Sequence, residues 1–247
     1  MVVAGEKMTG APRLAAEASR RIGAGMTTLL CPSSVKELYQ INTLGTLVKP
    51  YTTPEDFQEA LSQKTVHGIV IGPGLEPNET TQELVEIALK TNKKIVLDAG
   101  ALSCFETHKK RLIDLLHDHC ILLPHEGEFQ RLFDQQSNKI TTAFNAAKIS
   151  GATLLLKGSD TIIASPQGIC YINTNGPPTL STAGTGDVLA GFVGGLLTQG
   201  CTPLVSGSAA AWIQGEAAQL FGPGLLAEDL IQEVPMVLRD LLCSNID

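Results

Sequence analysis

Residues 182–191 read TAGTGDVLAG, and this segment is the most informative one for the fold of the chain. The glycines at 184 and 186 allow backbone N–H groups to converge on one point, and the apolar residues after them predict a helix over 187–199. A helix N-terminus offers N–H groups without intrahelical partners and the positive end of the helix dipole. We therefore expect an anion to bind where this loop enters the helix.

Asp187 is the carboxylate of this segment, and it falls in the first turn of the predicted helix. Such a position also suits a residue that only caps the helix. The two neighbouring glycines favour a functional role, because a cap alone does not require them. The spacing differs from the GxGxxG fingerprint of dinucleotide-binding folds, and no GxxxxGK[ST] phosphate loop occurs in the sequence.

Short runs rich in β-branched and aliphatic residues precede this segment and predict strands. They cover 26–30, 68–71, 94–98, 120–123, 153–156 and 161–164. Their apolar residues are continuous rather than alternating, which indicates strands buried on both faces. Helical patterns cover 13–24, 79–91, 187–199, 202–221 and 227–242. This alternation predicts an α/β fold whose mostly parallel central sheet is flanked by helices on both faces.

Composition narrows the range of functions. The formal net charge of -7 leaves no basic field for nucleic acid or an anionic membrane surface, so an anionic ligand must be held by local geometry. No apolar stretch is long enough to span a bilayer, and no signal-peptide pattern is present. None of the six cysteines lies in a CxxC spacing, which disfavours a zinc ribbon and indicates a reducing, cytoplasmic location. Because no repeat or linker is recognisable, we expect residues 1–247 to form a single domain.

Residue types suited to ligand binding follow four of the predicted strands. They are Gly72-Pro73-Gly74, Asp98-Ala99-Gly100, PHEGE at 124–128 and Lys157-Gly158. Ligands of open parallel sheets bind beyond the carboxyl ends of the strands, so these segments predict a rim around a ligand. His125 lies on this rim after a buried strand and a proline, which favours ligand contact over a packed or solvent-facing role. The glutamates beside it could bind a metal or solvate a helix start, and we assign no protein-bound metal.

Several segments resemble, in matching order, a known enzyme family. TAGTGD resembles the anion-hole motif of the ribokinase-like superfamily, in which the final aspartate is the catalytic base. IGPGL at 71–75, VLDAGAL at 96–102, LPHEGEF at 123–129, LLKGSDT at 155–161 and GLLAEDL at 224–230 resemble the ADP/ATP-dependent NAD(P)H-hydrate dehydratase family. The PHxGEF element is the most specific to that family, and the likeness runs from about residue 10 to about residue 238.

The resemblance implies a hydro-lyase that restores NADH or NADPH from its hydrate by phosphorylating the hydrate hydroxyl and eliminating phosphate. Its co-substrate would be ADP or ATP, with Mg²⁺ held by the nucleotide phosphates and water. Asp187 would be the catalytic base and would contact the hydrate with Ala11, Gly74 and His125. The anion hole would comprise Ala183, Gly184, Thr185 and Gly186. The nucleotide contacts would be Lys157, Gly158, Ser159, Asp160, Thr161 and Gly186. The family is commonly tetrameric, so a homo-oligomer is expected.

The sequence departs from the family pattern at a few positions. Gly100 stands where the family usually has a second aspartate, and a glycine common before the anion hole is replaced around Thr179. From the start at Val2-Val3-Ala4-Gly5 we expect a shortened lead-in to the substrate rim and no fused epimerase domain.

Two other functions fit part of the pattern. A ribokinase-like kinase of the hydroxymethylpyrimidine or thiazole type shares GTGD, but it does not predict PHEGEF at 124–129. A catalytically silent nucleotide-binding homologue is the other alternative, and the retained Asp187 disfavours it. The residue types alone also allow 157–161 to be a polar hairpin turn.

Overall fold

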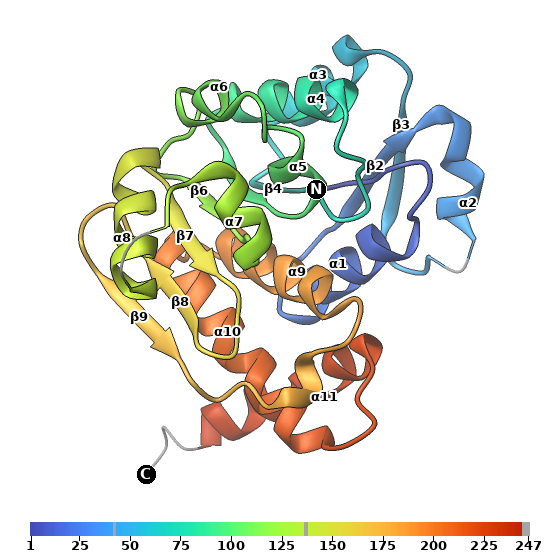
Figure 1. The fold of residues 1–247 in the computed structure, drawn as a ribbon. Helices are drawn as coiled ribbons and strands as arrows, with labels where there is room; N and C mark the ends of the chain where they lie inside the picture. Colours follow the sequence, from blue (N-terminus) through green and yellow to red (C-terminus); the bar gives the residue numbers. More distant parts are fainter. Residues whose placement is uncertain (42, 136–137, 244–247) are drawn as a thin grey trace.

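The computed structural model describes residues 1–41, 43–135 and 138–243, and its centre is a nine-stranded sheet (Figure 1). The strand order is β3-β2-β1-β4-β5-β6-β7-β8-β9. All pairs from β3 to β7 are parallel, whereas β8 is antiparallel to both β7 and β9. The strands are β1 (Val2–Val3), β2 (Thr28–Pro32), β3 (Leu47–Tyr51), β4 (Gly68–Ile71), β5 (Lys94–Leu97), β6 (Cys120–Leu122), β7 (Thr153–Leu156), β8 (Thr161–Ala164) and β9 (Cys170–Asn173). The predicted, mostly parallel sheet is confirmed.

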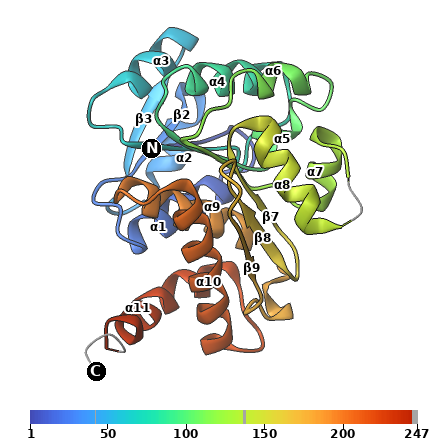
Figure 2. The ribbon, with the colours of Figure 1, turned by 90° about the vertical axis from the view of Figure 1, so that its left-hand side faces the viewer.

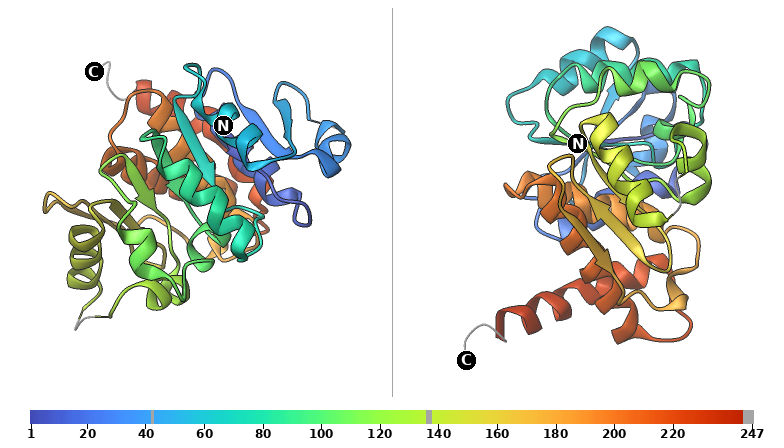
Figure 3. Two further views of the ribbon diagram at one scale, coloured as in Figure 1. Left: turned by 90° about the horizontal axis from the view of Figure 1, so that it is seen from above. Right: turned by 60° about the vertical axis from the view of Figure 1, so that its left-hand side comes forward.

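Two layers of helices enclose this sheet, as Figure 2 shows. One layer contains α1 (Gly10–Arg21), α9 (Thr185–Thr198), α10 (Pro203–Phe221) and α11 (Ala227–Cys243). The other contains α3 (Pro54–Ser62), α4 (Glu79–Leu89), α5 (Gly100–Ser103), α6 (Lys109–Ile113), α7 (Glu126–Leu132) and α8 (Lys139–Ser150). The short elements η1 (Ser33–Val35), α2 (Lys36–Gln40) and η2 (Pro178–Leu180) lie in connections. The red helix α11 lies at the opposite end of the molecule from α3 and α4 (Figure 3).

The strands divide their side chains between two cores, because successive side chains point to opposite faces of a sheet. In β4, Val70 packs in the core that includes α1 and α9, whereas Ile69 and Ile71 pack in the core that includes α3 and α4. The strands β5, β6 and β7 alternate in the same way. A strand covered on both sides needs apolar residues at consecutive positions, which is the pattern that the sequence showed. None of the helices in the described ranges combines the length and apolar character needed to cross a bilayer.

Two glycines allow α9 to lie very close to α1. A Cβ added to Gly191 would lie 2.3 Å from the carbonyl oxygen of Ala15, and one added to Gly195 would lie 2.2 Å from a methyl group of Ile22. The hydroxyl of Ser19 donates a hydrogen bond of 2.9 Å to the Gly191 carbonyl. This packing fixes where α9 begins, and with it the glycine-rich loop.

A second close approach involves the loop after β4 and Gly100, one of the positions where the sequence departs from the family pattern. Gly72 has φ of 128°, and a Cβ there would lie 1.7 Å from the Asp98 carbonyl oxygen. A Cβ on Gly100 would lie 2.0 Å from the Leu75 carbonyl oxygen. The backbone of the loop after β4 therefore fills the space in which a side chain at position 100 would have to lie.

All of the predicted strands and helices occur, with ends shifted by at most a few residues. The strands β1, β3 and β9 were not predicted. β1 has two residues, β3 contains Lys49 and Pro50, and β9 exposes Tyr171 and Ile172. None of the three is a continuous buried run of useful length, so the pattern that identified the central strands does not apply to them.

Candidate active site

Three chemically active residues follow neighbouring parallel strands at one edge of the sheet. Asp98 directly follows β5, His125 lies just beyond β6, and Lys157 directly follows β7. The Lys157 N–H donates to the Pro124 carbonyl at 2.9 Å, and His125 pairs with Lys157 in an isolated parallel bridge. Carboxyl ends of parallel strands meet at the same edge, so the fold gathers residues that are far apart in the sequence.

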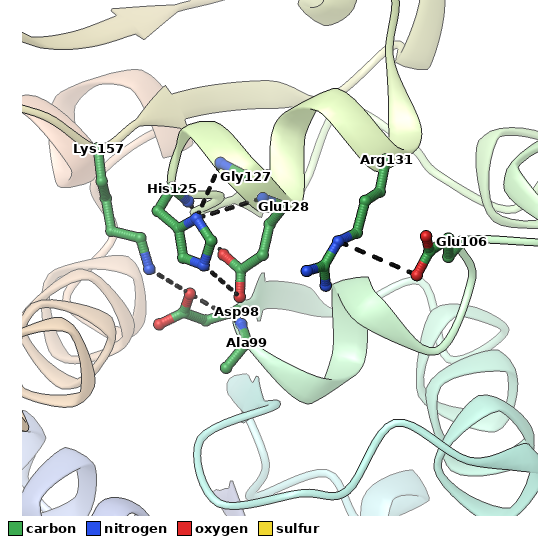
Figure 4. Close-up of polar contacts among 8 residues, drawn as sticks. All are labelled: Asp98, Ala99, Glu106, His125, Gly127, Glu128, Arg131 and Lys157. Carbon is green, nitrogen blue, oxygen red and sulfur yellow. Dashed lines mark hydrogen bonds and ion pairs between the residues drawn. The ribbon is translucent and has the colours of Figure 1, made fainter.

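Asp98 and Lys157 form a buried ion pair (Figure 4). The Lys157 Nζ lies 2.6 Å from Asp98 Oδ1, and the Asp98 side chain is 2% exposed. Burial disfavours the charged ammonium, but the carboxylates of Asp98, Glu128 and Asp187 outweigh it and raise the pKa of Lys157. The lysine is therefore a cation held by Asp98, with Glu128 and Asp187 near enough to act on its charge.

Asp187 is the third residue of α9, and its side chain does not cap the helix, because the N-cap residue is Gly184. The pKa of Asp187 is raised to about 6, mainly because burial disfavours the carboxylate. The charge of Asp98 adds to this rise, and the Lys157 ammonium opposes it. A carboxyl with this pKa can accept a proton near neutral pH more readily than an exposed aspartate.

The start of α9 is held from several sides. The Thr185 hydroxyl donates to the carbonyls of Leu180 and Thr182, both at 2.9 Å, and Gln214 donates to the Thr185 carbonyl at 2.7 Å. Gly184 has φ of 89°, a conformation that favours glycine. Gly186 has an ordinary helical conformation, and a Cβ there would lie 3.7 Å from the Lys157 Nζ. The lysine ammonium therefore lies beside the first turn of α9.

A cavity of about 450 Å³ opens beside this turn. Its walls are the β7–β8 turn, β9, η2, α9 and α10. Of the residues singled out in the sequence, Lys157, Gly158, Ser159, Thr161, Thr185 and Gly186 line it. Thr179, at the other position where the family pattern changes, belongs to η2 next to the cavity wall. A hollow of about 720 Å³ at the amino ends of the strands is lined by none of the predicted site residues.

His125 has a local role that its sequence context did not indicate. Its Nδ1 accepts hydrogen bonds from the N–H groups of Gly127 and Glu128 at 3.0 and 3.2 Å, and Glu128 accepts one from the His125 N–H at 3.0 Å. This reciprocal pair caps α7. With Nδ1 as the acceptor, Nε2 bears the proton of the neutral ring, and it lies 3.6 Å from Glu128 Oε1. The ring is 57% exposed, so one edge remains open to a ligand.

The remaining predicted residues lie at the margins of this arrangement. Ala11 is the second residue of α1 and lies against Gly74, since a Cβ on Gly74 would be 3.5 Å from the Ala11 Cβ. Ala183 is exposed in the loop before α9. The Asp160 side chain pairs with Lys139 at 2.5 Å and is not among the groups that line the cavity.

The sequence reasoning missed Asp98 and Glu128 as members of the site. Both are buried carboxylates, 1% and 6% exposed, and both lie within segments that had been singled out. The signal available was that Asp98 ends a predicted buried strand and that Glu128 lies in the segment after the next one, because a buried carboxylate is seldom left without a partner.

Comparisons with known proteins agree with this geometry. A family model described as NAD(P)H-hydrate dehydratase matches residues 1–235. The chain is 36% identical to the bifunctional NAD(P)H-hydrate repair enzyme Nnr of Moorella thermoacetica, over 95% of this chain and 48% of that protein. It is 32% identical to the ADP-dependent (S)-NAD(P)H-hydrate dehydratase of Neisseria meningitidis serogroup B, over 97% of this chain and 78% of that protein. The chain spans about half the length of the bifunctional relatives.

Solved structures show the same architecture. The ADP/ATP-dependent NAD(P)H-hydrate dehydratase of Bacillus subtilis, co-crystallised with ATP and Mg²⁺, is 27% identical, with a TM-score of 0.79 over 97% of this chain and 88% of that one. A ribokinase-like superfamily protein of Enterococcus faecalis is 24% identical, with a TM-score of 0.82 over 97% of this chain and 86% of that one. The expected ribokinase-like fold is thus confirmed.

Proposed function

This chain belongs to the NAD(P)H-hydrate dehydratase family, and from that premise we propose that it dehydrates NADH hydrate and NADPH hydrate with an adenine nucleotide as co-substrate. The observation that supports this best is the placement of Asp187. A carboxyl whose pKa is raised to about 6 lies in the first turn of α9, next to a helix N-terminus suited to a phosphoryl group and beside the Lys157 ammonium.

The proposed chemistry begins at the hydrate hydroxyl. Asp187 accepts the hydroxyl proton while the oxygen forms a bond to the terminal phosphorus of the nucleotide, and the bond from that phosphorus to the leaving nucleotide breaks. The substrate C–O bond then breaks with loss of phosphate, and the neighbouring carbon gives up a proton to the departing phosphate as the ring double bond forms. Hydroxide is a poor leaving group and phosphate a good one, so a kinase-like site serves a dehydratase.

Different residues of the site bind the nucleotide and the hydrate in this proposal. The N–H groups of Ala183, Gly184, Thr185 and Gly186 stabilise the charge that develops on the transferred group. The nucleotide occupies the cavity beside α9, against Lys157, Gly158, Ser159, Thr161 and the backbone of Asp160. Ala11, Gly74 and the open edge of His125 contact the hydrate.

The site also suits Mg²⁺ that is bound mainly through the nucleotide. Within residues 1–41, 43–135 and 138–243, no three His, Cys, Asp or Glu side chains are placed to enclose a metal ion. The Asp98 carboxylate is engaged by Lys157, and Glu128 is engaged in capping α7. The nucleotide phosphates and water would therefore supply most of the ligands, and the ion would neutralise charge on the phosphates.

The setting of the enzyme is part of the same proposal. We expect residues 1–247 to act as one domain, in the cytoplasm and as a homo-oligomer, a tetramer by analogy with the family. The described cysteines are unpaired, which suits a reducing compartment. Apolar side chains that β9 and α10 leave exposed (Tyr171, Ile172, Trp212, Leu220 and Phe221) are available for self-association.

Incubation with chemically prepared NADH hydrate, Mg²⁺ and either ADP or ATP tests the proposal. We expect dihydronicotinamide absorbance to return only with nucleotide, and Asp187→Asn to be the inactive control. Phosphorylation of a hydroxymethylpyrimidine or thiazole alcohol without dehydration would instead identify a kinase. Nucleotide binding with no turnover of either substrate would identify a silent homologue.

A further inference from the structure

Asp98 is a buried carboxylate to which the proposed reaction assigns no step. Its Oδ1 accepts hydrogen bonds from the Lys157 Nζ at 2.6 Å and from the Ala99 N–H at 2.8 Å. Ala99 has φ of 45° and ψ of -118°, which is unusual for a residue with a Cβ, and the Gly72 backbone lies directly against the Asp98 carbonyl. Such a conformation persists only where the surrounding structure determines it, so the position of Asp98 is fixed from several sides.

The position of the Lys157 ammonium also needs an explanation. It lies 3.7 Å from the place of a Cβ on Gly186, beside the first turn of α9. The N-terminus of a helix is its positive end, and it repels a cation. The lysine remains there because the Asp98 carboxylate holds it, while Glu128 and Asp187 add negative charge nearby.

We propose that Asp98 is a positioning residue, whose carboxylate holds the Lys157 ammonium beside the start of α9 so that two positive groups already face the phosphoryl group when it arrives. This inference rests on the proposed function. The phosphoryl oxygens would meet the ammonium and the helix N-terminus in place, so binding need not order a flexible lysine side chain. Asp98 would act through Lys157 without touching either ligand.

The same carboxylate influences the base. The charged groups that act on Asp187 are Asp98, which follows β5, and Lys157, which follows β7, while Glu128 on α7 acts on both of these. Asp98 raises the pKa of Asp187 and Lys157 lowers it. Replacing Asp98 by asparagine removes the first influence and leaves the ammonium uncompensated, so both changes lower the pKa of Asp187.

The pH dependence of turnover distinguishes this role from a structural one. A base must be unprotonated, so wild-type kcat should fall as the pH drops through about 6. In Asp98→Asn we expect kcat to be roughly 10- to 100-fold lower, from loss of a charge-assisted hydrogen bond, with KM for the hydrate little changed. We expect the acid limb of its profile to move to lower pH by about one unit. If the acid limb of the kcat profile stayed at the wild-type pH, the proposed effect of Asp98 on the pKa of Asp187 would be wrong.

Glu86 provides a matched control on α4. It is 7% exposed and pairs with Arg111 at 2.5 Å, so Glu86→Gln also breaks the ion pair of a buried carboxylate, in a different part of the molecule. This variant should lose stability but keep the wild-type acid limb. If Glu86→Gln shifted the limb as Asp98→Asn does, the shift would report general destabilisation, and the positioning role would be wrong.

A double-mutant cycle tests whether Asp98 acts through Lys157. Lys157→Met shortens the side chain by one atom and removes its charge. In that background, Asp98→Asn should cost little further kcat, because the group that Asp98 positions is gone. If the two substitutions instead lowered kcat by independent factors that multiply in the double variant, Asp98 would act by another route.

A measurement that needs no turnover separates this inference from the proposed function. Acetic anhydride labels free amines, and quantitative mass spectrometry reports the rate at Lys157. We expect faster labelling of Lys157 in Asp98→Asn, because the pKa of the amine falls when its partner is removed. An unchanged rate would overturn the inference, whereas failure of the wild type to dehydrate the hydrate would overturn the proposed function alone.

Discussion

The turn between β7 and β8 contributes one residue to each of two lysine–aspartate pairs. The two pairs have the same chemistry, but one is buried and the other is exposed. The Lys157–Asp98 pair has a contact of 2.6 Å, and its carboxylate is 2% exposed. The Lys139–Asp160 pair has a contact of 2.5 Å, and its carboxylate is 55% exposed. Water screens the exposed pair, whereas charges in a buried site act strongly on their neighbours. Only the buried pair can influence the base and the phosphate position.

Residue type and spacing therefore do not by themselves identify a functional pair. The short segment Lys157-Gly158-Ser159-Asp160-Thr161 supplies one member of each pair. The Lys157 side chain meets Asp98 inside the site, whereas that of Asp160 meets Lys139 on α8. Substitutions at five positions, ordered by the size of the effect that we expect, test whether function follows the buried pair.

Asp187→Asn should have the largest effect, since Asp187 is the base beside the buried pair. Asparagine keeps the size of the side chain but cannot accept the proton, so kcat should fall by roughly 10²- to 10⁴-fold. Nucleotide affinity, measured by calorimetry, should change little. A variant that keeps near wild-type turnover would remove Asp187 from the mechanism.

Gly186→Ala should weaken nucleotide binding without harming the fold. Its φ is not positive, and the added Cβ would meet only the Lys157 Nζ, at an ordinary contact distance of 3.7 Å. Alanine favours a helix by about 1 kcal/mol over glycine, so Tm should hold or rise. Nucleotide affinity should fall by about tenfold, because the methyl group would lie between the ammonium and the arriving phosphate.

Gly184→Ala is the matched control for that variant. Gly184 has φ of 89°, and a Cβ there would lie 2.9 Å from side-chain carbons of Leu14 and Ala227. We expect a clear loss of Tm. Unaltered nucleotide affinity in a well-folded Gly186→Ala protein would contradict the placement of the phosphate at α9.

His125 should contribute several-fold to hydrate binding, and two variants separate that contribution from its capping of α7. His125→Asn retains a good N-cap residue but removes the exposed Nε2–H, so the affinity for the hydrate should fall several-fold with Tm nearly unchanged. His125→Ala should show the same loss of affinity and an additional loss of about 1 kcal/mol in stability. Full hydrate affinity in His125→Asn would leave the histidine as a cap only.

Asp160→Asn should have the smallest effect. Its pair with Lys139 is exposed, and surface pairs contribute about 0–1 kcal/mol to stability. We expect kcat, KM for the nucleotide and Tm to stay within about twofold or a few degrees of the wild type. A loss comparable to that in Asp98→Asn would show that burial does not distinguish the two pairs.

The central fold could be predicted from the sequence because its physical signals are local. Continuous apolar runs identified β4, β7 and β8 with their observed ends, and the segment around Asp187 placed a helix start within two residues. The edge strands β3 and β9 could not be found in this way, because an exposed edge does not require a continuous apolar run.

The family pattern, the glycine-rich loop and the candidate base could be identified from the sequence, since each consists of consecutive residues. The tertiary structure was needed to bring Lys157 to Asp98, 59 positions earlier in the chain, and to bury Asp187 so that its pKa rises. It also decided that Gly184, rather than Gly186, needs the freedom of glycine. These outcomes depend on which strand ends lie side by side and on how deeply each charge is buried, and neither is a property of neighbouring residues.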